Sequence, residues 1–105
     1  MLIIEGNNIA LSKGDDAAIS FTLTLASGSP REIGKGETVF FVSTCGINVQ
    51  ATAPESSNTA VVTIPATATA NVEEGNYMWE LVFKTATTTY HATLPQPFRL
   101  MGVCS

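Results

Sequence analysis

The sequence predicts an all-β protein in which antiparallel sheets pack face to face. Within the segment 17–25, apolar and hydroxyl-bearing residues alternate strictly from Ile19 to Leu25, and apolar residues again occupy every second position along 76–84. Strand side chains alternate between faces with a period of two, so each segment has one apolar face and one wetter face. Half-buried strands of this kind indicate sheets that bury one face against each other.

Composition agrees with this fold class. The chain has 105 residues, the size of one domain, so we expect a single domain over 1–105 with one core. Its hydrophobic content of 45% is ordinary, but its charged content of 13% is low, against about 25% in typical domains. Thr, Ser and Ala fill the difference, and these residues suit strand surfaces better than helices.

The first half of the chain predicts four strands. Residues 2–5 form a short strand, and a turn over 6–8 leads to renewed alternation at Ile9 and Leu11. A tight turn over 13–16 precedes the strand 17–25, because Gly and Asp tolerate the backbone geometry of turns.

A second turn over 26–30 leads, past further glycines, to a strand over 37–45. Its middle, residues 39–42, is apolar on both sides, as is usual for a strand at the centre of its sheet.

The second half continues in the same manner. Residues 47–51 form a weaker strand, and a polar turn leads to a strand that Pro65 ends. One helical turn is allowed within 66–74, a segment too short to be a stable helix alone. The strand 76–84 is followed by a threonine-rich hairpin and a return strand over 89–94. Pro95 and Pro97 then force a kink or a sheet edge before the last apolar residues.

These short strands, separated by Gly, Asn, Ser and Pro turns, are typical of an immunoglobulin-like antiparallel β-sandwich of about seven to eight strands. Trp79 is the residue expected at the centre of the core. The predicted structural core comprises Phe21, Leu23, Phe41, Trp79, Leu81 and Phe83.

Charge and hydropathy exclude several partners. The net charge is −4, and the five fixed cations form no basic stripe that phosphates could follow, which argues against nucleic acid. No apolar stretch approaches the roughly 20 residues needed to cross a bilayer, so we expect a soluble protein with no membrane partner. The first residues show no cationic region and no cleavage site, so no export signal is expected.

Cys45 and Cys104 lie far apart in the sequence, and neither belongs to a closely spaced pair of the zinc-binding kind. One interpretation is a disulfide between a middle strand and the C-terminal tail, worth about 4 kcal/mol. The other is two unpaired thiols, with Cys45 packed as a small apolar residue. Without an export signal we expect unpaired thiols, because reducing compartments rarely keep a disulfide.

Catalytic groups are scarce, so we expect no enzyme. His91 is the only histidine, and a half-exposed imidazole on a sheet face is the simpler interpretation than a general base. The two carboxylate pairs are adjacent in sequence and point to opposite sides of an extended backbone, so neither forms an acid/base couple. We therefore expect no catalytic site, no cofactor site and no small-molecule substrate site.

Two groups of residues could form binding sites, but a structural role explains each of them. Asp15 and Asp16 lack a third spaced ligand for calcium, so turn formation explains them and no metal is expected. An aromatic sugar-binding platform would use Tyr77, Trp79, Tyr90 and Phe98. Tyr77 and Trp79 share the face assigned to the core, so core packing is the preferred interpretation.

The segments 13–30, 36–43 and 71–83 resemble a known family. A Lys13-Gly14-Asp15 turn precedes an alternating strand, Gly36-Glu37-Thr38-Val39 opens an apolar strand, and Gly75-Asn76-Tyr77 opens the aromatic one. This arrangement is similar to the immunoglobulin-like domain at the N-terminus of phage baseplate upper proteins, and to small proteins of phage and prophage tail regions. The similarity covers nearly the whole chain.

The resemblance implies a non-enzymatic structural or adaptor module of a phage or prophage tail or baseplate, often present in symmetric copies. It implies protein partners, including self-association and other tail subunits. The expected location is the virion, or the bacterial cytoplasm before assembly. The family carries no catalytic residues to transfer.

Physical chemistry gives an independent reason for assembly. An open sandwich has edge strands with unpaired backbone groups, and few charges protect them here. The apolar ends 1–4 and 99–103 either meet a neighbouring copy or pair within the monomer. The alternative function is an immunoglobulin-like adhesion or carbohydrate-binding module of a bacterial surface protein. A small hydrolase, with His91 beside a nucleophile, is the third and weakest interpretation.

Overall fold

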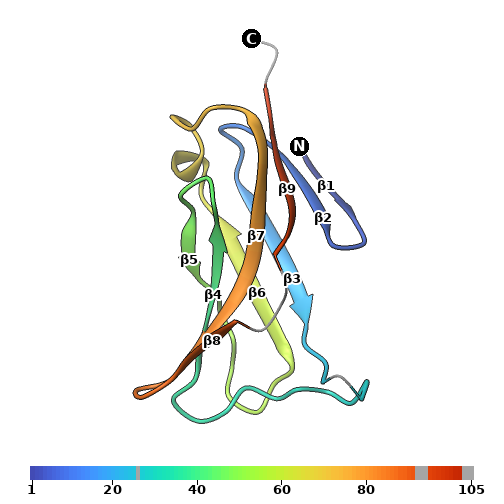
Figure 1. Cartoon of the computed structure of the whole chain (residues 1–105), viewed down its shortest axis with the longest axis vertical. Coiled ribbons are helices and arrows are strands. Elements are labelled where there is room, and N and C mark those ends of the chain that lie inside the picture. The colour runs from blue at the N-terminus through green and yellow to red at the C-terminus, as the bar shows by residue number, and fades with distance from the viewer. Residues whose placement is uncertain (26, 92–94, 103–105) are drawn as a thin grey trace.

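The computed structural model describes residues 1–25, 27–91 and 95–102, which form a β-sandwich of one large and one small sheet (Figure 1). The strands of the described residues are β1 Leu2–Glu5, β2 Asn8–Ser12, β3 Ala17–Thr22, β4 Thr38–Ser43, β5 Asn48–Gln50, β6 Thr59–Ile64, β7 Gly75–Lys84, β8 Thr89–His91 and β9 Gln96–Met101. A single 3₁₀ turn, η1 Ala66–Ala68, lies within the segment where a helical turn was predicted.

The large sheet has the order β1-β2-β9-β7-β4-β5, and β8 pairs with the second half of β7. The small sheet is the pair β3-β6. The pairing of β3 with β6, and of β7 with β4 on one side and β9 on the other, follows the B–E and C–F–G pairing of immunoglobulin-like sandwiches. The predicted all-β sandwich class is confirmed.

One pairing departs from the antiparallel prediction, because β2 and β9 run parallel. Ile9 lies beside Phe98 and Leu11 beside Leu100, so the first and last parts of the chain share the inner face. Alternation along a strand is the same in both orientations, so the sequence pattern carried no information on direction.

The N-terminal hairpin is closed by two residues, and Gly6 has φ of +61°. A left-handed residue at the first turn position gives a type II′ turn, which matches the twist of the flanking strands. The turn fixes Glu5 opposite Asn8 and Ile3 opposite Ala10. The hairpin forms the right-hand side of the molecule in Figure 1.

Several strand boundaries differ from the prediction, and β4 and β5 are each shorter than the predicted 37–45 and 47–51. β3 ends at Thr22 rather than at 25: the Leu23 amide still donates to the carbonyl of Asn58, but Thr24 then forms an isolated bridge with Pro30 and not with β6. Leu25 is consequently half exposed. The sheet edge predicted at Pro97 is present at that residue, where β9 pairs with β7 alone, whereas from Phe98 onward β9 lies between β2 and β7. Pro97 is tolerated because the pairing with β2 starts one residue later.

The core lies between the two sheets. Leu23, Phe41, Trp79, Leu81 and Phe83 are buried. The exception in the predicted core is Phe21, which is only half-buried because it lies near the end of β3 in a sheet of two strands.

Val82 was expected on the wetter face of its strand but is buried. It faces outward, where it pairs with Phe40 on β4 and His91 on β8. The Lys84 ammonium lies 4.7 Å from the centre of the Phe40 ring, so the outer face near Val82 is itself partly covered.

Trp79 joins three parts of the structure. Its ring stacks on Phe41 at 5.6 Å and lies 5.3 Å from Phe21. Its indole Nε1–H donates to the carbonyl of Asn7 at 2.9 Å. The side chain therefore connects the core to the turn of the N-terminal hairpin.

Replacement of Trp79 by Ala is expected to lower the free energy of unfolding by about 3–5 kcal/mol, because it removes a large buried ring and leaves a cavity. Urea unfolding followed by far-ultraviolet circular dichroism measures the effect. The neighbouring Met78→Ala, on the exposed face, is the control and should change stability by less than about 1 kcal/mol. Equal losses in the two variants would contradict the assignment of the core face.

Candidate functional site

His91, the histidine considered above as a general base, lies on the outer face of the large sheet. His91 is mostly exposed, and its Nδ1 lies 2.6 Å from Oε1 of Glu80 on the adjacent strand. No hydroxyl or thiol nucleophile belongs to this contact among the described residues. The pair has the geometry of a surface contact between strands.

The acidic turn residues hold loops together. The Asp16 carboxylate accepts a hydrogen bond from the Ala66 amide at 2.7 Å, and Asp15 contacts the amino group of Met1. Beside them, the Gly14 amide donates to the buried hydroxyl of Thr69 at 2.9 Å. Within the described part of the chain, no group of three or more His, Cys, Asp or Glu side chains is placed to hold a metal ion.

The aromatic residues considered for sugar binding do not form a solvent-facing row. Trp79 and Phe98 are buried, and Tyr77 is half-buried with its hydroxyl donating to the Glu73 carbonyl at 2.7 Å. The side chain of Tyr90 lies outside what the structure describes. Cys45 is half-buried against the core, and its predicted relation to Cys104 involves a residue outside the described ranges.

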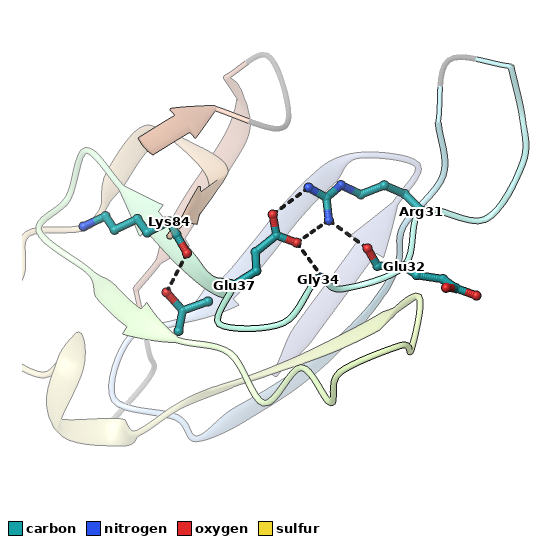
Figure 2. Close-up of polar contacts among 6 residues, drawn as sticks. Arg31, Glu32, Gly34, Glu37 and Lys84 are labelled. Carbon is teal, nitrogen blue, oxygen red and sulfur yellow. Dashed lines mark hydrogen bonds and ion pairs between the residues drawn. The ribbon is translucent and has the colours of Figure 1, made fainter. Parts of the chain in front are cut away.

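An ion pair that sequence reasoning missed lies at one end of the sandwich. Figure 2 shows the Arg31 guanidinium facing the Glu37 carboxylate, with nitrogen–oxygen distances of 2.5 and 2.8 Å. Glu37 also accepts a hydrogen bond from the Gly34 amide at 3.1 Å, and Arg31 donates to the Glu32 carbonyl at 3.0 Å. This two-point contact is the stronger form of carboxylate recognition.

The pair is shielded from solvent and rests on the core. The Glu37 side chain is 8% exposed, and the Arg31 guanidinium carbon lies 4.1 Å from the centre of the Phe83 ring. Burial alone would raise the pKa of Glu37, but hydrogen bonds from Arg31 and Gly34 and the charge of Arg31 outweigh it, so this pKa lies below its ordinary value of 4.5. The network fastens the loop before β4 across the end of the core.

A largely apolar concavity lies on the outer face of the large sheet. We name it the outer groove: it has a volume of about 510 Å³ and crosses β1, β2, β9 and β7. Side chains on the outer face of these strands line it, among them Ile3, Glu5, Ala10, Met78, Pro97, Arg99 and Met101. Ile3 and Met78 are about 40% exposed there, and Arg99 is exposed as well.

The described parts of the apolar ends discussed above both pair with β2, which lies between them. Residues 99–101 lie in β9 between β2 and β7, and β1 pairs with β2. The other side of β1 faces no described strand, so its edge is open. β9 is therefore paired inside the monomer on both sides. β1 is paired inside the monomer on the side of β2 only.

Comparisons with models of known protein families, with curated proteins and with solved structures give no match. The phage-tail resemblance therefore stays a prediction. No helix in the described ranges is long and apolar enough to cross a membrane.

The Arg31–Glu37 network predicts acid-sensitive stability. Glu37→Gln should lower the free energy of unfolding at pH 7 by about 1–3 kcal/mol, because the buried carboxamide binds the guanidinium less strongly. Since the pKa of Glu37 is lowered in the folded chain, its contribution is fully present above its ordinary pKa of 4.5 and is lost as the pH falls through the folded value.

Urea unfolding at pH 7 and at about pH 3 tests this prediction. The difference between the parent and Glu37→Gln should shrink at the lower pH. Glu32→Gln is the matched control, because Glu32 is exposed and meets Arg31 only through its backbone carbonyl in the contacts described above. A pH-independent loss in Glu37→Gln would contradict the assignment.

Proposed function

We propose that the chain is a non-enzymatic structural or adaptor module of a phage or prophage tail or baseplate, acting through protein–protein contacts. The outer groove beside the open edge of β1 is the observation that carries the proposal. It is an apolar surface with two ionic groups, Glu5 and Arg99, and such surfaces rimmed by polar residues are typical of protein interaction sites.

The placement of the ionisable groups supports a binding role. The described polar contacts of Asp16, Arg31 and Glu37 fasten loops to the sandwich, and that of His91 joins two strands. The pairs lie on different parts of the surface and do not converge with a nucleophile in one cleft, as acid–base or covalent catalysis requires.

The adhesion or carbohydrate-binding alternative has less support. Sugar-binding platforms depend on exposed aromatic faces, whereas Trp79 and Phe98 face the core and Tyr77 is bound to the Glu73 carbonyl. Beside its polar residues, the outer groove exposes the aliphatic side chain of Ile3 and the flexible side chain of Met78, which suit a peptide surface better than a sugar ring.

The tail role predicts that the chain is present in particles. Purified particles released by the encoding bacterium after prophage induction should contain the chain at the tail, in a fixed number of copies. Immunogold electron microscopy and quantitative mass spectrometry measure its position and copy number. Absence of the chain from particles that carry a complete tail would overturn the tail assignment.

Incorporation into particles should depend on the outer groove. Met78→Lys is expected to reduce incorporation at least about tenfold, because a buried, unpaired ammonium opposes docking. Val61→Lys is the matched control, since Val61 is similarly exposed, at 37% against 39% for Met78, but lies on the small sheet. Equal incorporation of both variants would place the contact elsewhere.

A further inference from the structure

We infer that the open edge of β1 binds the same edge of a second copy. The two β1 strands pair antiparallel across a two-fold axis, with Ile3 of each copy opposite the other. This inference rests on the proposed function, since it names one protein partner of the same face. The pairing joins two large sheets into one continuous sheet.

The hydrogen-bonding pattern of the hairpin identifies the groups that the edge offers. The Met1 carbonyl accepts from the Ser12 amide at 2.8 Å, so the odd-numbered residues of this strand direct their backbone groups toward β2. Leu2 and Ile4 therefore direct their N–H and C=O groups away from β2. These donors and acceptors are the ones available to another strand.

Only one register uses all of them. With Ile3 at the two-fold axis, Leu2 of each copy lies opposite Ile4 of the other, and the two pairs form four backbone hydrogen bonds. Moving the axis to Ile4 would place Leu2 opposite Gly6, whose φ of +61° belongs to a turn and not to an extended strand. That register leaves a single hydrogen-bonded pair.

Charge favours the same register. Glu5 is the only charged residue of β1, and each copy has a net charge of −4. With Ile3 on the axis, the two Glu5 positions lie four residues apart, about 14 Å along the strands, which exceeds the screening length of about 8 Å. With Ile4 on the axis they lie about 7 Å apart and repel each other.

The side chains of β1 suit a second apolar strand. Ile3 and Ile4 are 40% and 49% exposed, and they point to opposite faces of the sheet. A strand added at the edge therefore covers apolar surface on both faces. Residues 2–5 contain no Lys and no Pro, the residues that commonly block an edge.

The pairing also joins the two outer grooves. Ile3 lies beside Ala10 in the sheet, so the row across the axis reads Ala10, Ile3 and then the same residues of the second copy in reverse order. At the centre the two Ile3 residues form a non-hydrogen-bonded pair, in which side chains approach most closely. The result is one longer apolar trough with an Arg99 in each half.

Sedimentation of the purified chain across a concentration series up to about 1 mM, with reductant present, tests the inference. A four-residue edge makes a small interface, so we expect a concentration-dependent shift from the mass of one copy to that of two. Ile4→Pro removes a donor on the outer side of β1 and leaves the pairing with β2 intact. It should raise Kd at least about tenfold, because the symmetric pair loses two hydrogen bonds.

Two variants guard against misfolding as the explanation. Ile4→Val keeps the amide and the apolar side chain and should dimerise as the parent does. Ile3→Lys keeps the backbone but places like charges opposite each other at the axis, so it should stay at the mass of one copy while its thermal unfolding matches that of Ile4→Val.

A parent chain that remains at one copy throughout the series overturns the pairing, and so does a dimer that Ile4→Pro leaves unchanged. Either result leaves the tail proposal standing if the chain is found in particles. A dimer sensitive to Ile4→Pro, together with absence from particles, supports the pairing and overturns the tail assignment.

Discussion

The contact of Trp79 with the N-terminal turn is the constraint on which the functional surface depends. A single side chain fills the core between Phe41 and Phe21 and donates its indole N–H to the Asn7 carbonyl, 72 positions away in the sequence. The other attachments of the hairpin β1–β2 are the pairing of β2 with β9 and the burial of Ile9 and Leu11 in the core, and neither contacts its turn. The open edge and half of the strands of the outer groove belong to that hairpin, so the buried Trp79 helps to position a surface that it does not line.

The two ends of β7 contact different parts of the structure. Near its start, Met78 and the residues beside it line the outer groove. Near its end, Phe83 lies under Arg31, and the Lys84 carbonyl accepts a hydrogen bond from Thr38 (Figure 2). At about 3.3 Å per residue these regions are some 20 Å apart along one strand. The ion pair can therefore be strengthened or lost without changing the groove directly.

Local pattern was enough to predict most strands, because burial of one face leaves a period of two in the sequence. Alternation located β7 and most of β3, and the apolar run 39–42 located β4. The same pattern could not give the direction of β2 beside β9, nor show that Val82 is covered on the outer face by its neighbours. These features depend on which distant strands become neighbours.

The candidate site was harder to predict for the same reason. Arg31 and Glu37 lie six positions apart around a glycine-containing turn, and nothing in their spacing indicates that the turn brings them face to face. The outer groove draws on four strands from both ends of the chain. The expectation of apolar ends did identify β1 and β9, but only the sheet order shows that β9 is enclosed and β1 is open.

An open apolar edge in a protein with few charges can lead to open-ended assembly of many copies. The difference between the two edges of the large sheet opposes such assembly. At the far side of the large sheet, β5 is three residues long and exposes Asn48 and Gln50. Joining β1 of one copy to β5 of the next would place an apolar strand against a short polar one, and such head-to-tail contacts are the ones that build fibres. A two-fold β1 pairing consumes the apolar edge of both copies and leaves only the polar edges of the joined sheet outside. Once the four residues of β1 are paired in both copies, no apolar edge is left, so the assembly ends at two copies.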